Sequence, residues 1–270
     1  MSPFASPGPW DAVADGYADE SAWLMTLFSA RAAELVPLDA ASKVVDVACG
    51  PGTTTLEIAG SVASVDALDF SSSMIARLRK DLADRGVANV TARQGDGQAL
   101  PYADASFDAA FSMFGLMFFP DRPRGFRELF RVLRPGGTAV VSSWASTVHS
   151  PLLQVMFGAL RAADPTMPEP KPNPLSLENP EVFEREMREA GFVDVKIERV
   201  EKAIAVESAV DLWSRFIRGS APIVMLRNRL GEVEWASRAK VGCAWLTDTL
   251  GPTPKTLATT ALLAVGARPR

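Results

Sequence analysis

The stretch "VVDVACGPGTTTLEIA", residues 44–59, decides the fold. An apolar, β-branched run contains Asp46 near its end, two glycines follow at Gly50 and Gly52, and a short helix is expected over residues 53–60. A strand that runs through a glycine turn into a helix commonly holds a nucleotide-like cofactor, because the first backbone amides of the helix are unpaired. The sequence therefore predicts a cofactor site where this strand ends.

The alternation of strand and helix continues along the first half of the chain. Serines 71–73 can cap a helix that stops at Gly86, and "RPGG" is expected to end the helix before the fifth strand. Strands alternating with helices through short connections predict an α/β fold, with a Rossmann-like, doubly wound parallel sheet. The five expected strands of this part are residues 43–48, 64–70, 89–96, 107–114 and 138–144.

The second half of the chain has a different rhythm. A proline-rich loop over residues 164–180 leads into a helix that begins at Pro180, and a strand is expected over 193–200. Residues 208–250 are expected to be mainly helical, and "TTALLAVGARP" to form a last strand. We therefore predict three parts: an N-terminal helical segment over 1–40, the Rossmann-like domain over 41–200 and 258–270, and a helical cap insertion over 201–257.

Composition limits the class of protein. Lys and Arg number 28 and Asp and Glu 32, for a net charge of −4 in 270 residues. This acidic balance, without a basic block, argues against a nucleic acid or an anionic membrane as partner. Two cysteines cannot form a disulfide framework. With no signal peptide and no apolar run of the ~20 residues that span a bilayer, we expect a cytoplasmic protein. The sequence does not indicate an oligomeric state.

The residues of the glycine turn discriminate between cofactors. A triphosphate loop requires a lysine after its glycines, and none is present. A dinucleotide fingerprint requires a third glycine, where this chain has Thr55. The carboxylate of Asp46 would repel a pyrophosphate but suits the amino group and the sulfonium of S-adenosylmethionine. The turn therefore favours S-adenosylmethionine as cofactor.

Two more acids are expected at the same edge of the sheet. Asp69 ends the second strand and can accept hydrogen bonds from ribose hydroxyls, while Asp96 ends the third strand and can accept from the adenine amino group. Open α/β sheets bind ligands in the crevice at the carboxyl ends of their strands. Three acids in consecutive strands beside a glycine turn therefore predict a binding site rather than three unrelated turns.

From about residue 10 to residue 145 the chain resembles the class I S-adenosylmethionine-dependent methyltransferases, nearest to the group of ubiquinone and menaquinone biosynthesis. The resemblance rests on five blocks in the family's order, although Ala48 stands where a glycine is common. It implies a seven-stranded sheet whose last strand is antiparallel. The five blocks are "WDAVADGYA", "VVDVACGPGTTTL", "DALDFSSSMI", "GDGQALPYADASFD" and "RELFRVLRPGGTAVVSSW".

The resemblance also implies a set of cofactor contacts. Asp46, Ala48, Gly50 and Gly52 would line the methionine end of the cofactor, and Tyr17 would close over it. The contacts expected along the ribose, the adenine and the strand that follows are Asp69, Phe70, Met74, Asp96, Gly97, Gln98, Ser112, Phe114 and Met117.

The chemistry of methyl transfer gives two candidate bases and an acceptor class. His149, the one histidine, follows the fifth strand and is the first candidate for a general base, and Tyr17 is the second. The segment "MFGLMFF" with Trp144, Trp213, Phe216 and Met225 favours a small apolar or aromatic acceptor. Three alternatives stay open: a protein of this fold that binds S-adenosylmethionine without transferring methyl, a protein or RNA methyltransferase, and a NAD-dependent oxidoreductase, which Asp46 and the missing third glycine disfavour. No metal site is predicted.

Overall fold

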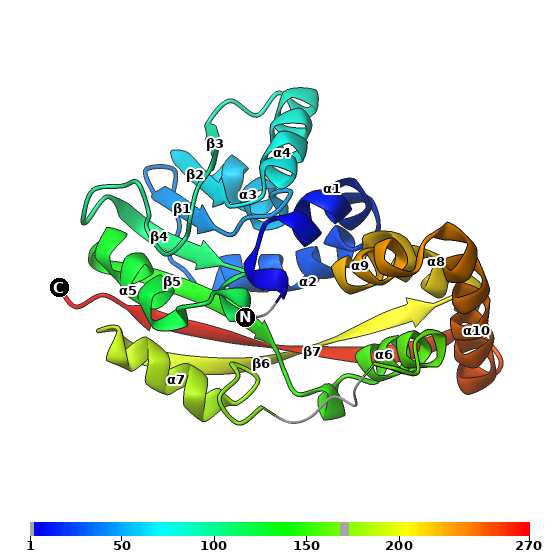
Figure 1. Cartoon of the computed structure of the whole chain (residues 1–270). Coiled ribbons are helices and arrows are strands. Elements are labelled where there is room, and N and C mark those ends of the chain that lie inside the picture. Colours follow the sequence, from blue (N-terminus) through cyan, green and yellow to red (C-terminus); the bar gives the residue numbers. More distant parts are fainter. Residues whose placement is uncertain (1–2, 168–172) are drawn as a thin grey trace.

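A computed structural model describes residues 3–167 and 173–270 of the chain. Seven strands form one sheet in the order β3-β2-β1-β4-β5-β7-β6. The first five strands are parallel, and β7 runs antiparallel to both of its neighbours. This confirms the predicted Rossmann-like sheet (Figure 1). The strands are β1 (Lys43–Val47), β2 (Ser64–Asp69), β3 (Val90–Gln94), β4 (Phe107–Ser112), β5 (Leu133–Trp144), β6 (Val193–Val206) and β7 (Lys255–Ala267).

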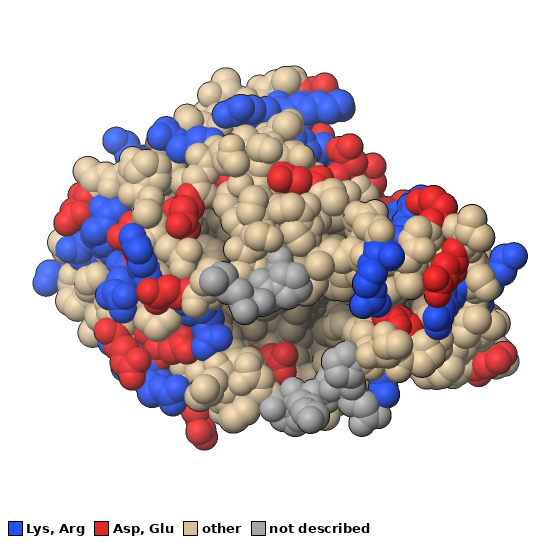
Figure 2. Space-filling model, in the orientation of Figure 1, with Lys and Arg blue, Asp and Glu red and all other residues tan. Residues whose placement is uncertain are grey.

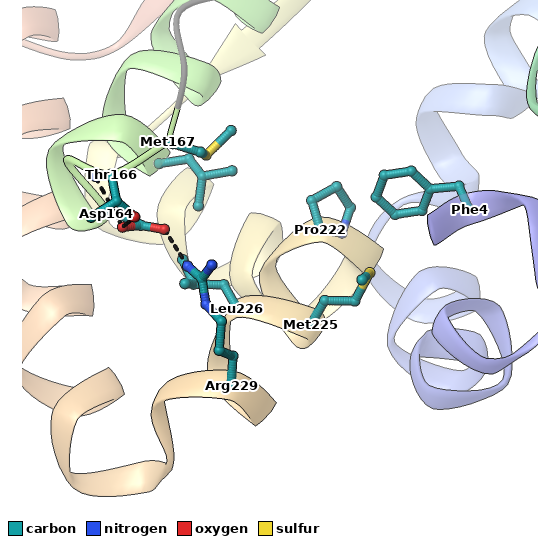
Figure 3. Close-up of a pocket in the computed structure, with 9 residues that line it drawn as sticks. Phe4, Asp164, Thr166, Met167, Pro222, Met225, Leu226 and Arg229 are labelled. Atoms are coloured by element: carbon teal, nitrogen blue, oxygen red, sulfur yellow. Dashed lines mark hydrogen bonds and ion pairs between the residues drawn. The ribbon is translucent and has the colours of Figure 1, made fainter. Parts of the chain in front are cut away.

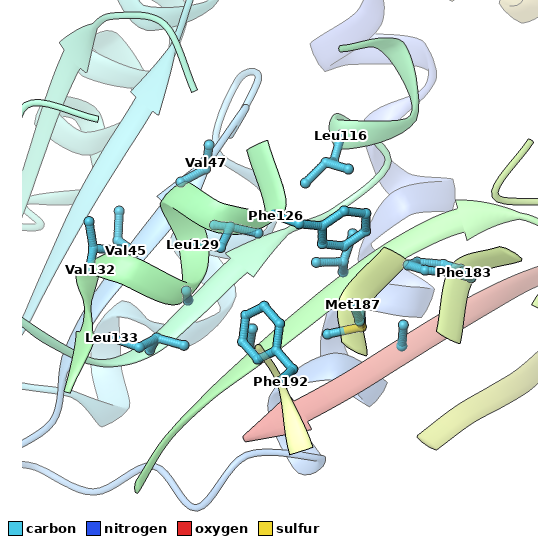
Figure 4. Packing of buried hydrophobic residues seen from close by; sticks show 14 of the residues in the cluster. Val45, Val47, Leu116, Phe126, Leu129, Val132, Leu133, Phe183, Met187 and Phe192 are labelled. Carbon is cyan, nitrogen blue, oxygen red and sulfur yellow. The ribbon is translucent and has the colours of Figure 1, made fainter. Parts of the chain in front are cut away.

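Helices cover both faces of the sheet, because the parallel strands are apolar on both sides. On one face lie α5 and α7, and Phe126 of α5 and Phe183 of α7 belong to the same buried cluster as Val45 and Val47 of β1, as Figure 4 shows. On the other face α2 packs on Val44 through Phe28. The helices are α1 (Gly8–Glu20), α2 (Ala22–Glu34), α3 (Thr53–Ile58), α4 (Ser72–Arg85), α5 (Arg122–Val132), α6 (Pro151–Ala163), α7 (Pro180–Glu189), α8 (Ala209–Gly219), α9 (Ala221–Leu230) and α10 (Glu232–Leu250), with short 3-10 turns η1 (Pro3–Ala5), η3 (Leu116–Phe118) and η4 (Thr147–His149).

Two strands, β5 and β6, extend furthest beyond their predicted bounds. β5 begins at Leu133, so that "RPGG" lies inside the strand and is accommodated by a shift of register against β4. β6 continues to Val206, six residues beyond its expected end, because it pairs with β7 along its whole length up to Lys255. The long β6–β7 ribbon carries α8, α9 and α10 between its strands. The division into three domains stays a prediction, and residues 168–172 of the expected proline-rich loop lie outside the described residues.

The N-terminal helix α1 bridges the sheet domain and the helices between β6 and β7. On one side the Asp11 carboxylate accepts hydrogen bonds from Ser71 Oγ (2.6 Å) and from the Ser73 amide (3.0 Å) at the start of α4. On the other side Ser21 Oγ donates to the Gly219 carbonyl oxygen of α8 (2.9 Å). A Cβ atom on Gly16 would overlap the backbone carbonyl of Arg218. Only a glycine therefore lets α1 and α8 approach this closely.

The close crossing of α1 and α8 predicts the effect of one methyl group. We expect Gly16→Ala to lower the free energy of unfolding by about 1–3 kcal/mol, because the added Cβ meets rigid backbone. Gly8→Ala in the same helix is the matched control, since a Cβ there has nothing within 4 Å. Urea unfolding of both variants measures the difference. Equal stability of the two variants would contradict the tight crossing.

Candidate cofactor and active site

The turn after β1 is built from left-handed backbone. Ala48, Gly50 and Gly52 have φ angles of 57°, 55° and 89°. A Cβ on Gly52 would also overlap the side chain of Leu78 in α4, which explains the second glycine. Ala48 takes the left-handed conformation as a non-glycine residue, at a cost of about 1–2 kcal/mol. The curled turn directs its backbone toward the carboxyl ends of β1 and β2, as the sequence predicts.

Asp46 is a buried carboxylate with one unpaired oxygen. Its side chain is 1% exposed, and Oδ2 accepts a hydrogen bond of 2.6 Å from Thr55 Oγ1. Oδ1 has no partner among the described residues. Burial, opposed by the bond from Thr55, raises the pKa of Asp46 to about 7. Such an oxygen fits the cationic amino group of S-adenosylmethionine, because a buried charge is stable only when it is paired.

Asp69 joins the turns that follow β1 and β2. Its two oxygens accept hydrogen bonds from the backbone amides of Gly50 (2.9 Å) and Ser71 (2.8 Å). Burial outweighs these bonds and raises the pKa of Asp69 to about 6. Each oxygen of a carboxylate accepts two hydrogen bonds, so the side chain still has capacity for the ribose hydroxyls.

Tyr17 reaches Asp69 from the N-terminal segment. Burial, and then the negative charge of Asp69, raise the pKa of Tyr17 to about 12. At neutral pH the phenol therefore keeps its proton and can donate it in a hydrogen bond. It is suited to cover a cofactor, as expected, but it is a poor general base.

Asp96 does not lie buried in line with the other two acids. It is exposed, and its Oδ1 accepts from the amide (2.8 Å) and the side-chain nitrogen (3.1 Å) of Gln98. Gln98 Oε1 in turn accepts from the Asp121 amide (2.9 Å). Gly97 is buried, and a Cβ atom added to it would lie only 2.5 Å from the ring of Phe119. These residues order the loop after β3, and their contact with a cofactor stays a prediction.

The residues after β4 divide between the turn and the core. Ser112 is buried, and its hydroxyl has no partner among the described residues. Phe114 has a φ angle of 58°, and its ring packs on Trp144 at 4.4 Å between centroids. Met117 Sδ accepts from Ser143 Oγ at 3.5 Å. Phe114 therefore contributes to the aromatic core behind the turn in this structure.

Two further predicted contacts lie beside α4. Met74 is buried against Val13 and Ala14 of α1, and so holds the N-terminal helix in place. The carbonyl oxygen of Phe70 accepts from Gln94 Nε2 at 3.0 Å. For Met74 and Phe70, as for Phe114 and Met117, the role in cofactor binding stays a prediction.

The structure does not bring His149 beside the acids. The side chain is exposed, and the carbonyl oxygen of His149 accepts from Thr260 Oγ1 of β7 (2.7 Å). β4 and β5 stand between β7 and β1, which carries Asp46. Three strand spacings of ~4.8 Å amount to roughly 14 Å. The assignment of His149 as a base stays a prediction.

Sequence reasoning missed three residues that hold the acids. Thr55 donates to Asp46 from the position at which a third glycine was sought. Ser71, read only as a helix cap, bonds Asp69 through its amide and Asp11 through its hydroxyl. The sequence signal for Ser71 was the run of serines after Asp69, whereas Asp11 lies 60 residues away and had no signal.

Comparisons with known proteins agree with this geometry. A family model described as a methyltransferase domain matches residues 44–137. This part of the chain is therefore similar to a methyltransferase domain. The demethylmenaquinone methyltransferase of Corynebacterium kroppenstedtii is 39% identical over 125 residues, which are 46% of this chain and 52% of that one. The enzyme of the same name from Mycolicibacterium vanbaalenii is 39% identical over 134 residues, 50% of this chain and 56% of that one. The chain thus spans about half the length of these relatives.

Solved structures show the same fold over nearly the whole chain. The YcgJ protein of Bacillus subtilis has a TM-score of 0.59 at 18% identity and covers 91% of this chain and 98% of its own. A Haemonchus contortus phosphoethanolamine N-methyltransferase, solved with S-adenosylhomocysteine, has a TM-score of 0.56 at 16% identity, covering 92% and 53%. The [4+2]-cyclase SpnF has a TM-score of 0.55 at 21% identity, covering 90% and 81%. The recognition of a class I methyltransferase fold near the menaquinone group is confirmed.

In the part of the chain that the structure describes, no helix is both long and apolar enough to cross a bilayer.

The buried Asp46 predicts how the stability of the free domain depends on pH. Its pKa of about 7 lies above its ordinary value of 3.8, so between these values the folded protein holds a proton that the unfolded chain has lost. Stability therefore falls as the pH rises through this window and levels above it. We expect Asp46→Asn, which stays neutral, to melt at a higher temperature than the natural protein at about pH 8.

Calorimetric melting between about pH 5 and about pH 8 measures this effect. Asp96→Asn is the control, because Asp96 is exposed. Melting curves of Asp46→Asn that follow those of the natural protein in parallel at every pH would contradict a proton on buried Asp46.

Proposed function

We propose that the protein is an S-adenosylmethionine-dependent methyltransferase that acts on a small apolar or aromatic molecule. One observation carries the proposal: within a methyltransferase domain, the unpaired Oδ1 of buried Asp46 lies at the mouth of the glycine turn. When bound, the cofactor supplies a methyl group activated by its sulfonium. The residues of the chain supply binding and alignment, which account for much of the rate of such a displacement.

Three side chains would hold the cofactor at its two polar ends. Ionised Asp46 would pair with the amino group, fixed by the bond from Thr55. Asp69 would accept from the ribose hydroxyls while Gly50 and Ser71 hold it in place. Protonated Tyr17 would cover the ribose beside Asp69 and exclude water. His149, if the loop that carries it closes, would take the proton of an acidic acceptor.

The class of acceptor is supported by the relatives and by charge. Demethylmenaquinone methyltransferases match about half of the chain, so an apolar ring is proposed as the acceptor class, without the particular quinone or the methylated atom. Against RNA as acceptor stands the net charge of −4. Figure 2 shows Lys and Arg interspersed with Asp and Glu on the face drawn, without a continuous basic stripe.

A second candidate is a protein that binds S-adenosylmethionine without transferring its methyl group. The same fold occurs in a protein described as a [4+2]-cyclase, so the fold does not decide between the two. Turnover decides. Release of S-adenosylhomocysteine with a panel of naphthols, hydroquinones and phenols supports the transferase, whereas tight cofactor binding with no release across the panel favours the second candidate.

If Asp69 binds the ribose, removing its carboxylate lowers the affinity for the cofactor. We expect Asp69→Ala to weaken S-adenosylmethionine binding about 100-fold, because each hydrogen bond to a charged group contributes about 1.5–3 kcal/mol. Asp66→Ala on the same strand is the matched control, since Asp66 pairs with Arg93 at 3.4 Å. Calorimetric titration with S-adenosylmethionine, S-adenosylhomocysteine and NAD measures both variants, with melting temperature as the check on folding. Unchanged affinity in folded Asp69→Ala would remove Asp69 from the site, and binding of NAD alone would overturn the cofactor.

The two candidate bases predict opposite patterns. His149→Ala is expected to slow turnover at saturating substrate about 100-fold and to leave cofactor affinity unchanged, as for loss of a general base. Tyr17→Phe is expected to weaken cofactor binding several-fold with a smaller effect on turnover, because its phenol keeps its proton. Steady-state kinetics and calorimetry separate these effects. An unaltered rate in His149→Ala would show that alignment alone suffices.

A further inference from the structure

A cavity of about 270 Å³ lies between α6, α9 and the N-terminal turn η1. Its walls are apolar and come from Leu160 of α6 and from Pro222, Met225 and Leu226 of α9, and Phe4 closes one side (Figure 3). Met225 is one of the residues that the sequence placed in an acceptor pocket. The volume is close to the lower end of small-molecule sites, about 300 Å³, and suits one or two rings.

One end of the cavity is polar. Asp164 Oδ2 accepts a bond of 2.5 Å from the Arg229 guanidinium, and Oδ1 accepts from Thr166 Oγ1 at 2.6 Å. The Asp164 side chain is 6% exposed, whereas that of Arg229 is 60% exposed. Among the described residues the guanidinium bonds only Asp164, so further N–H donors face the cavity and solvent.

The charge of this corner selects the ligand. The pair of Asp164 and Arg229 is neutral as a unit, so the corner does not attract an anion, and a carboxylate beside Asp164 is repelled. A hydroxyl group meets both partners, because it can accept from a remaining N–H of Arg229 and donate to the second lone pair of Asp164 Oδ2. An uncharged ring with a hydroxyl group is the chemistry that fits.

Aromatic contacts connect the cavity to the cofactor site. The ring of Phe4 lies 5.9 Å from that of Trp10 and 5.8 Å from that of Phe118, just after β4. Trp10 lies 6.5 Å from Tyr17, whose pKa responds to the charge of Asp69. Figure 3 places Phe4 across the cavity from Arg229. A ring anchored at Arg229 therefore points its other end toward Phe4, and Trp10 lies between Phe4 and Tyr17.

We propose that this cavity is a binding site for an uncharged hydroxylated aromatic molecule of one or two rings. Arg229 and Asp164 hold its hydroxyl group at the polar corner, and Phe4 covers its other end. Phe4 and Trp10 lie between the cavity and Tyr17, so the binding of such a molecule does not rest on the proposed methyl transfer.

Equilibrium dialysis with three probes of one shape tests the proposal. We expect 2-naphthol to bind the whole protein about tenfold tighter than naphthalene, as one added hydrogen bond predicts, and tighter than 2-naphthoate. Met225→Trp fills the cavity and should abolish binding of 2-naphthol. Arg229→Leu should reduce the preference for 2-naphthol over naphthalene to less than about threefold. Arg227→Leu is the matched control on the same helix, because Arg227 pairs with Glu232 away from the cavity.

Each other outcome overturns a stated part. No binding of 2-naphthol to the natural protein, or equal binding to folded Met225→Trp, rejects the cavity as its site. Tighter binding of 2-naphthoate rejects the neutral class, and a preference that survives in Arg229→Leu rejects the polar corner. Calorimetric titration with S-adenosylhomocysteine, the product formed from S-adenosylmethionine, is run on the same samples. Loss of naphthol binding with that affinity intact rejects this proposal alone, whereas absent cofactor binding rejects the proposed function.

Discussion

The burial of Asp46 at the end of β1 is the constraint on which the site depends. An ionised carboxylate with a free oxygen is costly in the interior, and here it is held by one hydroxyl, from Thr55. The left-handed turn of residues 48–52 keeps the backbone curled around it, and Asp69 holds that turn through the Gly50 amide. The cost is recovered when a cation pairs with the free oxygen. The domain thus exchanges stability of the free state for affinity.

Ser71 links Asp69 to the N-terminal helix α1. Its amide bonds Asp69 and its hydroxyl bonds Asp11, so that Asp69 and α1 are both held by one residue. On its opposite side α1 meets α8 at Gly16, where there is no room for a Cβ atom. One helix thus contacts both the residue that holds Asp69 and the helices between β6 and β7.

The sequence predicted those parts whose cause is local. The glycine turn, the strands and the acids Asp46 and Asp69 were found because left-handed backbone, buried strands and strand-end carboxylates leave a mark within a few residues. The exposure of Asp96 and its bonds with Gln98 were not foreseen, and its contact with a cofactor stays a prediction. Asp11 and the pairing of Asp164 with Arg229 join residues 60 and 65 positions apart, and no local pattern encodes them. The extension of β6 depends likewise on its partner β7.

The family match over residues 44–137 includes the glycine turn but not the cavity between α6 and α9. A turn that must place a carboxylate against a cation tolerates few substitutions, because left-handed angles and a buried charge each restrict the residue type. The walls of the cavity between α6 and α9 need only be apolar and of suitable volume, a requirement that many side chains meet. Within those walls, only the neutral pair of Asp164 and Arg229 has a demanding geometry. In the proposed binding site, the choice of ligand would therefore depend chiefly on these two residues.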